Sequence, residues 1–193
     1  MGKGRLEAFS DGVLAIIITI MVLELKVPAG HDLEALRPLL PVFLSYVLSF
    51  VYLGIYWNNH HHLMHTVGRV TAGIMWANLH LLFWLSLVPF STGWMGENPE
   101  AGPLPTALYA ANMLMAGISY LVLQTAIVAS QGKESMLAAA IGSDLKGKLS
   151  GAAYAAAIGL SFVSSWISWA IFVAVALLWL VPDPRIERKL EAR

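Results

Sequence analysis

Cysteine is absent from this sequence, and charged residues are scarce. Without cysteine the chain has no disulfide, no thiolate zinc site and no cysteine nucleophile. Only 12% of the 193 residues are charged, and 12 basic residues balance 12 acidic ones to a net charge of zero. The basic residues form no stripe of the kind that binds nucleic acid, so we expect no nucleic-acid partner.

Apolar residues, in contrast, are in excess. The sequence is 58% hydrophobic with a mean hydropathy of +0.67, whereas soluble domains are about 45–50% apolar and about 25% charged. This composition predicts an all-α integral membrane protein. Lys3 and Arg5 ahead of an apolar run resemble the start of a signal peptide, but Ser10 and Asp11 interrupt that run. We therefore expect the first run to be a spanning helix.

Six stretches are candidate transmembrane helices, for which roughly 20 apolar residues cross about 30 Å of hydrocarbon. We place them at about 9–25, 38–57, 70–90, 106–130, 147–164 and 166–181, in a single domain covering 1–193. The last two are short and divide near Ser164-Ser165. Residues 58–62 are expected at an interface or in an aqueous turn, and the Gly- and Pro-rich segment 91–105 is predicted to be a loop. In the fifth span, Gly147 and Gly151 form a small-xxx-small pair that is predicted to allow close helix packing.

The distribution of basic residues orients these spans. With the N-terminus inside, the outer segments hold only Lys26 and Arg37. The inner segments hold the other basic residues: Lys3, Arg5, Arg69, Lys133, Lys146, Lys148, Arg185, Arg188, Lys189 and Arg193. The positive-inside rule then places both termini in the cytoplasm, as an even number of spans requires.

The first span begins with a base and an acid, and both are costly close to hydrocarbon. Arg5 and Asp11 are six residues apart, about 600° around a helix, so they do not share a face and each needs another partner. Two other segments supply polar groups at the same depth: residues 57–62, and a third-span set of Trp76, Asn78 and His80. We expect a buried polar network joining the first three helices, either as a scaffold or as a functional site.

Above Asp11, Ile16, Ile20 and Leu23 follow spacings of four and three and form one stripe, with Thr19 beside it. From the residues alone, such a stripe is more often a packing or lipid-facing surface than the lining of a pore. Glu24, next to Leu23, is either an acidic group at the outer mouth or an ordinary interfacial residue.

Two alternative functions would depend on the ionisable residues, as a proton relay or as metal ligands. Asp11 and His80 are candidates for an intramembrane relay in a proton-coupled transporter. His61 and His65, four residues apart, are candidate zinc ligands on one helical face, but the Glu of a His-Glu-x-x-His site is missing and no nearby carboxylate completes the set. We therefore expect no metal site and no cofactor.

The pattern Arg-x-x-x-Phe-Ser-Asp, at Arg5, Phe9, Ser10 and Asp11, resembles the first helix of the transmembrane protein 175 family of potassium channels and their bacterial relatives. The segments Tyr56 to His61, Asn78 to Phe83 and Leu180 to Arg185 resemble further signatures of that family. The resemblance implies a homotetrameric cation channel of a bacterial inner membrane that contacts lipid and is not an enzyme.

The resemblance also implies roles for individual residues. Ile16, Ile20 and Leu23 would form a hydrophobic constriction along a path lined by the first helix of each subunit, and Thr19 a selectivity layer near the permeant potassium ion. With one threonine layer and no Thr-Val-Gly-Tyr-Gly loop, we expect moderate preference for potassium over sodium. The remaining residues would brace the first helix: Arg5, Phe9, Ser10, Asp11, His61, Trp76, Asn78 and His80.

Overall fold

The computed structural model describes residues 2–97, 102–132, 137–138 and 144–180, and within them every regular element is helical. Its helices are α1 (Lys3–Ile20), α2 (Leu40–His65), α3 (Ala72–Ser86), α4 (Val88–Glu97), α5 (Leu104–Gln131), α7 (Leu145–Leu160) and α8 (Ser165–Leu180). Two 3₁₀ segments, η1 (Met21–Glu24) and η2 (Leu33–Leu39), extend α1 and precede α2. The expected all-α class is therefore confirmed.

Four helical segments in the described residues are long and apolar enough to cross a membrane: Lys3–Glu24, Leu33–His65, Ala72–Glu97 and Leu104–Gln131. Helices α7 and α8 have 16 residues each, which corresponds to about 24 Å of helix. The predicted division near Ser164-Ser165 falls between them. Long apolar helices make this a multi-pass membrane protein, while the count of six spans stays a prediction.

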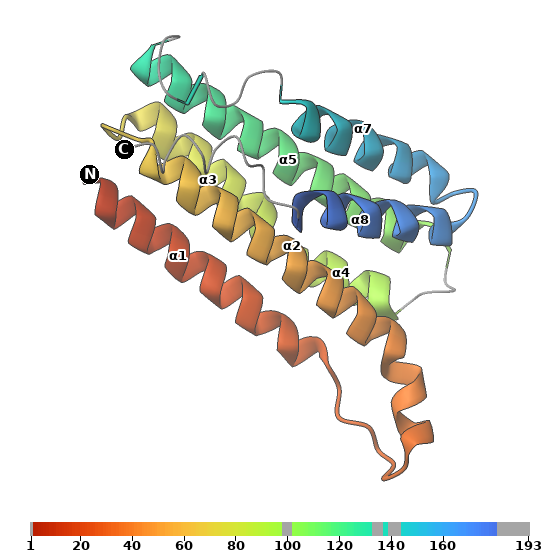
Figure 1. Ribbon diagram of the computed structural model, residues 1–193. Coiled ribbons are helices and arrows are strands. Elements are labelled where there is room, and N and C mark those ends of the chain that lie inside the picture. Colours follow the sequence, from red (N-terminus) through yellow and green to blue (C-terminus); the bar gives the residue numbers. More distant parts are fainter. Residues whose placement is uncertain (1, 98–101, 133–136, 139–143, 181–193) are drawn as a thin grey trace.

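The helices form a bundle with α1 on one side and α7 on the other (Figure 1). Helix α5 packs against α3, α4 and α7, and α1 packs against α2 and α3. The side chain of Lys3 donates to the carbonyl of His65 at 3.1 Å, and Gln131 donates to the carbonyl of Thr66 at 2.6 Å. The start of α1 and the ends of α2 and α5 therefore lie at the same end of the bundle.

The core contains hydroxyl groups that join helices as well as apolar side chains. Thr92 on α4 donates to Ser49 on α2 at 2.7 Å, and the Ser49 hydroxyl lies 3.0 Å from the hydroxyl of Tyr109 on α5. Tyr52 on α2 donates to the carbonyl of Phe172 on α8 at 2.6 Å. Because every helix satisfies its own backbone, such side-chain contacts determine which helices pair in an apolar environment.

Two sequence predictions of non-helical structure are wrong at least in part. Of the two alternatives for residues 58–62, the aqueous turn is wrong, because α2 continues without a break to His65; the interface position stays a prediction. The segment 91–105 was predicted to be a loop, but 91–97 belongs to α4; residues 98–101 lie outside the described part of the chain. Residues 102–103 are outside any helix, and Gly102 has a positive φ of 107°, as in a turn. Gly96, in contrast, serves close packing. A Cβ added at Gly96 would lie 2.9 Å from the Cα of Val42 on α2 and would overlap the hydroxyl of Ser45.

Replacing Gly96 by alanine should therefore destabilise the protein by about 1–3 kcal/mol, the usual cost of overpacking against backbone that has no room to move. Gly54→Ala on α2 is the matched control, because a Cβ there meets nothing within 4 Å. Thermal unfolding of the two variants in detergent, followed by tryptophan fluorescence, makes the comparison. Equal melting temperatures would show that the α2–α4 contact tolerates a side chain at Gly96.

Candidate functional site

Helix α1 is attached to the bundle along a single face. Its buried residues recur at intervals of four and three, as expected for one helical stripe: Leu6, Ser10, Leu14, Ile17 and Met21. Beside this face, Ile16 and Ile20 on α1 and Leu23 on η1 are 64%, 46% and 76% exposed. One chain therefore presents an uncovered apolar stripe along the C-terminal half of α1 and onto η1.

A chain of three buried side chains connects α1 with α3 and α2. Ser10 donates to the carbonyl of Leu6 at 2.9 Å and accepts from Nδ2 of Asn78, also at 2.9 Å. On the other side of Asn78, its Oδ1 accepts from Nε2 of His60 at 2.7 Å. This arrangement requires the imidazole proton on Nε2. Each amide atom of Asn78 thus has a partner on a different helix.

Asp11 follows Ser10 in the sequence and has a hydrogen-bond partner outside the Ser10–Asn78–His60 set. Its Oδ1 accepts from the indole nitrogen of Trp57 on α2 at 3.0 Å. Arg5, which does not share a helical face with Asp11, is exposed, and its side chain makes no hydrogen bond or ion pair within the described residues. The acid of the first helix is therefore held by α2, and the base is not part of that contact.

The histidine that is hydrogen-bonded to Asn78 is His60, and not His61, the residue predicted for the network. His61 points to the exposed side of α2, where its Nε2 lies 3.1 Å from Nε2 of His65 and its ring stacks on Trp57. These two histidines share a face, as their spacing predicts. The described residues nevertheless contain no group of three or more side chains suited to hold a metal.

Three other predicted network residues lie apart from the Ser10–Asn78–His60 chain. His80 accepts from the indole nitrogen of Trp84, one turn further along α3, at 3.1 Å. Trp76 and Phe9 are exposed in the single chain, Trp76 by 67%. Asp11 and His80 have no hydrogen bond to each other in the described part of the chain, so the geometry supplies no direct relay between them.

Thr19 lies on the exposed side of α1, next to the apolar stripe. Its hydroxyl donates back to the helix, at 2.8 Å from the carbonyl of Ala15 and 3.1 Å from that of Ile16. A hydroxyl that donates in this way still has oxygen lone pairs to offer. At this position α1 therefore presents an oxygen acceptor to whatever lies outside its exposed face.

The segment that follows α1 and η1 contacts α4. Lys26 forms an ion pair with Glu97, and its hydrogen bond to that carboxylate raises the pKa of Lys26. Glu24 lies beside Gly93, where a Cβ would come within 3.3 Å of its Oε2. The carboxylate of Glu24 thus faces α4 in the single chain, on the side away from Thr19.

Comparison with known proteins places this chain among channels. Residues 5–89 match the family model described as endosomal/lysosomal potassium channel TMEM175. A potassium channel from Chryseobacterium sp. strain P1-3 is 53% identical over 191 residues, 99% of each chain. A potassium channel from Streptomyces collinus is 32% identical over 200 residues, 96% of each chain.

A solved structure has the same fold. The crystal structure of a lysosomal potassium-selective channel TMEM175 homolog from Chamaesiphon minutus superposes with a TM-score of 0.81 at 30% identity. The match covers 93% of this chain and 96% of that one. With this fold and with relatives that match along nearly its whole length, the chain belongs to the TMEM175 family.

Proposed function

We propose that this protein is a potassium-permeable cation channel in which four copies surround an ion path lined by α1. One α1 per chain does not enclose a path, so closed rotational symmetry has to supply the other walls. The potassium channels that match nearly the full length of this chain support the transported ion. We place the channel in a bacterial inner membrane, with six spans and cytoplasmic termini.

The observation that carries this proposal is the uncovered stripe of α1. Ile16, Ile20 and Leu23 are exposed on a helix whose other face is fully occupied by the bundle. In a symmetric assembly these side chains form rings that offer no oxygen to replace hydration water, so a narrow path dewets and closes there. The three residues are our candidates for the constriction.

Thr19 supplies a different chemistry at nearly the same depth. Four copies place four hydroxyl oxygens around the path, and such oxygens can replace part of an ion's hydration shell. Potassium gives up water more easily than sodium, so a single polar layer gives moderate selectivity. No further cofactor is needed for this function.

Polar substitutions in the constriction should increase conduction. Leu23→Asn or Ile20→Asn should raise the single-channel potassium conductance by about tenfold, the effect of lowering the barrier by about 1.4 kcal/mol. Leu177→Asn is the control, because Leu177 is exposed on α8, away from α1. Planar-bilayer recordings of the purified protein measure the effect. If Leu23→Asn and Ile20→Asn conduct like the wild type, as the control should, these residues do not form the constriction.

Removing the hydroxyl of Thr19 should affect selectivity more than conductance. Thr19→Val keeps the shape of the side chain but removes the oxygen, so the preference for potassium over sodium should fall towards unity. Thr19→Ser retains the oxygen and should keep most of the preference. Reversal potentials under potassium–sodium gradients give the ratio. An unchanged ratio in Thr19→Val would assign selectivity to another layer.

We further propose that Ser10, Asn78 and His60, together with Asp11, brace α1 in the assembly. Asn78→Leu leaves Ser10 and His60 buried without this partner, at a cost of about 1–3 kcal/mol for each such group. We expect fewer tetramers and a lower melting temperature, whereas Asn58→Leu at an exposed α2 position should change neither. Light scattering after size exclusion measures the assembly; a stable tetramer of Asn78→Leu with normal currents contradicts the bracing role.

A further inference from the structure

A cavity of about 400 Å³ lies between α2, α5, α7 and α8, on the far side of the bundle from the exposed stripe of α1. None of its lining residues belongs to the site described above. Its volume falls in the range of ligand pockets, and its lining is mainly apolar and aromatic with a few polar groups. The position of this cavity at the lipid boundary follows from the proposed placing of α1 at the channel axis.

Glycines keep this cavity open. Gly117 on α5 and Gly147 and Gly151 on α7 contribute to its wall. The sequence analysis had assigned Gly147 and Gly151 to close helix packing, but a Cβ added at Gly151 meets nothing within 4 Å. At Gly147 the nearest atoms are those of Asp144, which caps the start of α7. Gly151 therefore leaves open space beside α7, whereas Gly147 makes room for the carboxylate of Asp144.

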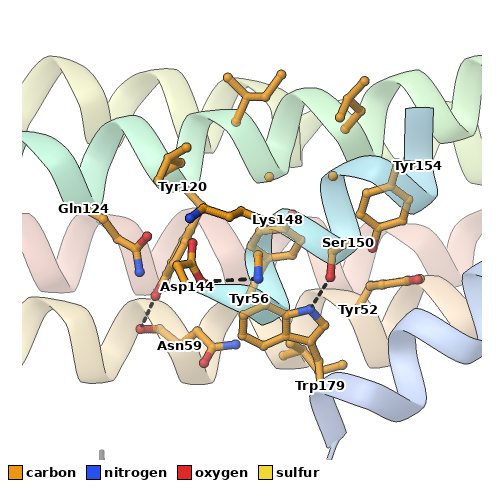
Figure 2. Close-up of a pocket in the computed structure, with 17 residues that line it drawn as sticks. Tyr52, Tyr56, Asn59, Tyr120, Gln124, Asp144, Lys148, Ser150, Tyr154 and Trp179 are labelled. Atoms are coloured by element: carbon orange, nitrogen blue, oxygen red, sulfur yellow. Dashed lines mark hydrogen bonds between the residues drawn. The ribbon is translucent and has the colours of Figure 1, made fainter. Parts of the chain in front are cut away.

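The polar groups of the cavity gather at one end. Figure 2 shows Asn59, Gln124 and Asp144 at that end and the rings of Tyr52 and Tyr154 at the other. Because Asn59 belongs to the last turns of α2, the polar end lies towards the end of the bundle where α1 begins. The cavity thus has a polar end towards the end of the bundle where α1 begins and an aromatic, apolar remainder.

Two opposite charges line the polar end, Asp144 and Lys148, one helical turn apart on α7. Asp144 accepts from the backbone nitrogen of Gly147 at 3.2 Å through Oδ1. Neither charged group forms an ion pair within the described residues. A carboxylate and an ammonium that line one cavity without pairing can hold a ligand that carries both charges.

We infer that this cavity binds one membrane phospholipid whose headgroup carries a phosphate and a protonated amine. The phosphate contacts Lys148, the ammonium contacts Asp144, and one acyl chain occupies the space beside Gly117 and Gly151. Basic pockets between transmembrane helices near the inner surface commonly hold lipid headgroups. Here the added carboxylate selects a zwitterionic headgroup over a purely anionic one.

The test is lipid retention by the purified channel, with phosphatidylethanolamine and phosphatidylglycerol of identical acyl chains as probes. Detergent-solubilised protein is incubated with an equimolar mixture, and the lipid bound per chain is counted by native mass spectrometry. The wild type should retain phosphatidylethanolamine in preference. Equal retention of both lipids, preference for phosphatidylglycerol, or retention of neither would overturn the proposal.

Two pairs of variants locate the site. Gly151→Leu should abolish retention by filling the cavity, while Gly159→Leu should not, because Gly159 has the same open surroundings on α7 but lies outside the cavity. Lys148→Gln should weaken retention of both lipids by about fivefold, the value of one basic group near an anionic headgroup. Arg69→Gln, an exposed base between α2 and α3, should leave retention unchanged.

Asp144→Asn tests headgroup selection without disturbing the fold. Asparagine keeps a side-chain oxygen for the cap of α7 and tolerates the left-handed backbone at this position, where φ is 42°. The variant should bind phosphatidylglycerol at least as well as phosphatidylethanolamine; an unchanged preference contradicts the ammonium contact. Potassium flux measured in parallel separates this proposal from the channel function. Lipid bound to a protein that conducts nothing contradicts only the channel, and normal flux without bound lipid contradicts only the lipid site.

Discussion

The hydrogen bonds of Asn78 to Ser10 and His60 determine how α1 is turned. Between helices in lipid there is little hydrophobic drive, so a buried polar contact contributes strongly to which faces meet. Thr19 is nine residues beyond Ser10, about 900° around the helix, and so lies opposite to it. The contact that attaches α1 to α3 therefore also fixes the side on which Thr19 and the apolar stripe are presented. Turning α1 by one residue would rotate Thr19 and the apolar stripe by about 100° and would break the hydrogen bond between Asn78 and Ser10.

The first helix is held by different contacts along its length. In the middle of α1, Asp11 accepts a hydrogen bond from Trp57, next to the buried Ser10. Beyond its C-terminal end, the segment after η1 contacts α4 through the ion pair of Lys26 with Glu97. Exposed ion pairs contribute little stability, so the contact beyond the C-terminal end of α1 is the weaker one. Movement of α1 should accordingly begin near Leu23 and leave the Ser10 contact in place.

The sequence was informative where hydrophobicity alone decides the structure and misleading where packing decides it. Apolar runs located the helices, and Ser164-Ser165 marked a real break, because both depend on local composition. The helical state of 91–97 was missed because glycine is a turn former in isolation, and its use at Gly96 depends on Val42 far away in the sequence. His60 was open to prediction: it follows buried Leu53 by seven residues and precedes buried Leu63 by three, so it shares their face. Its partner Asn78 on α3 could not be predicted, because the positions of α2 and α3 along each other depend on tertiary packing.

The short helices and the cavity beside them have a common physical basis. Sixteen residues of α7 or α8 reach about 24 Å, several Å less than the hydrocarbon thickness of a typical bilayer. In the proposed assembly this pair lies on the outside, so the membrane has to thin there or place lipid where protein is missing. A glycine-lined space whose wall includes α7 and Trp179 of α8, with charges only at its polar end, favours the second outcome. The same bundle then presents protein oxygens to an ion on its α1 side and a lipid-shaped space to the bilayer on its α7 side.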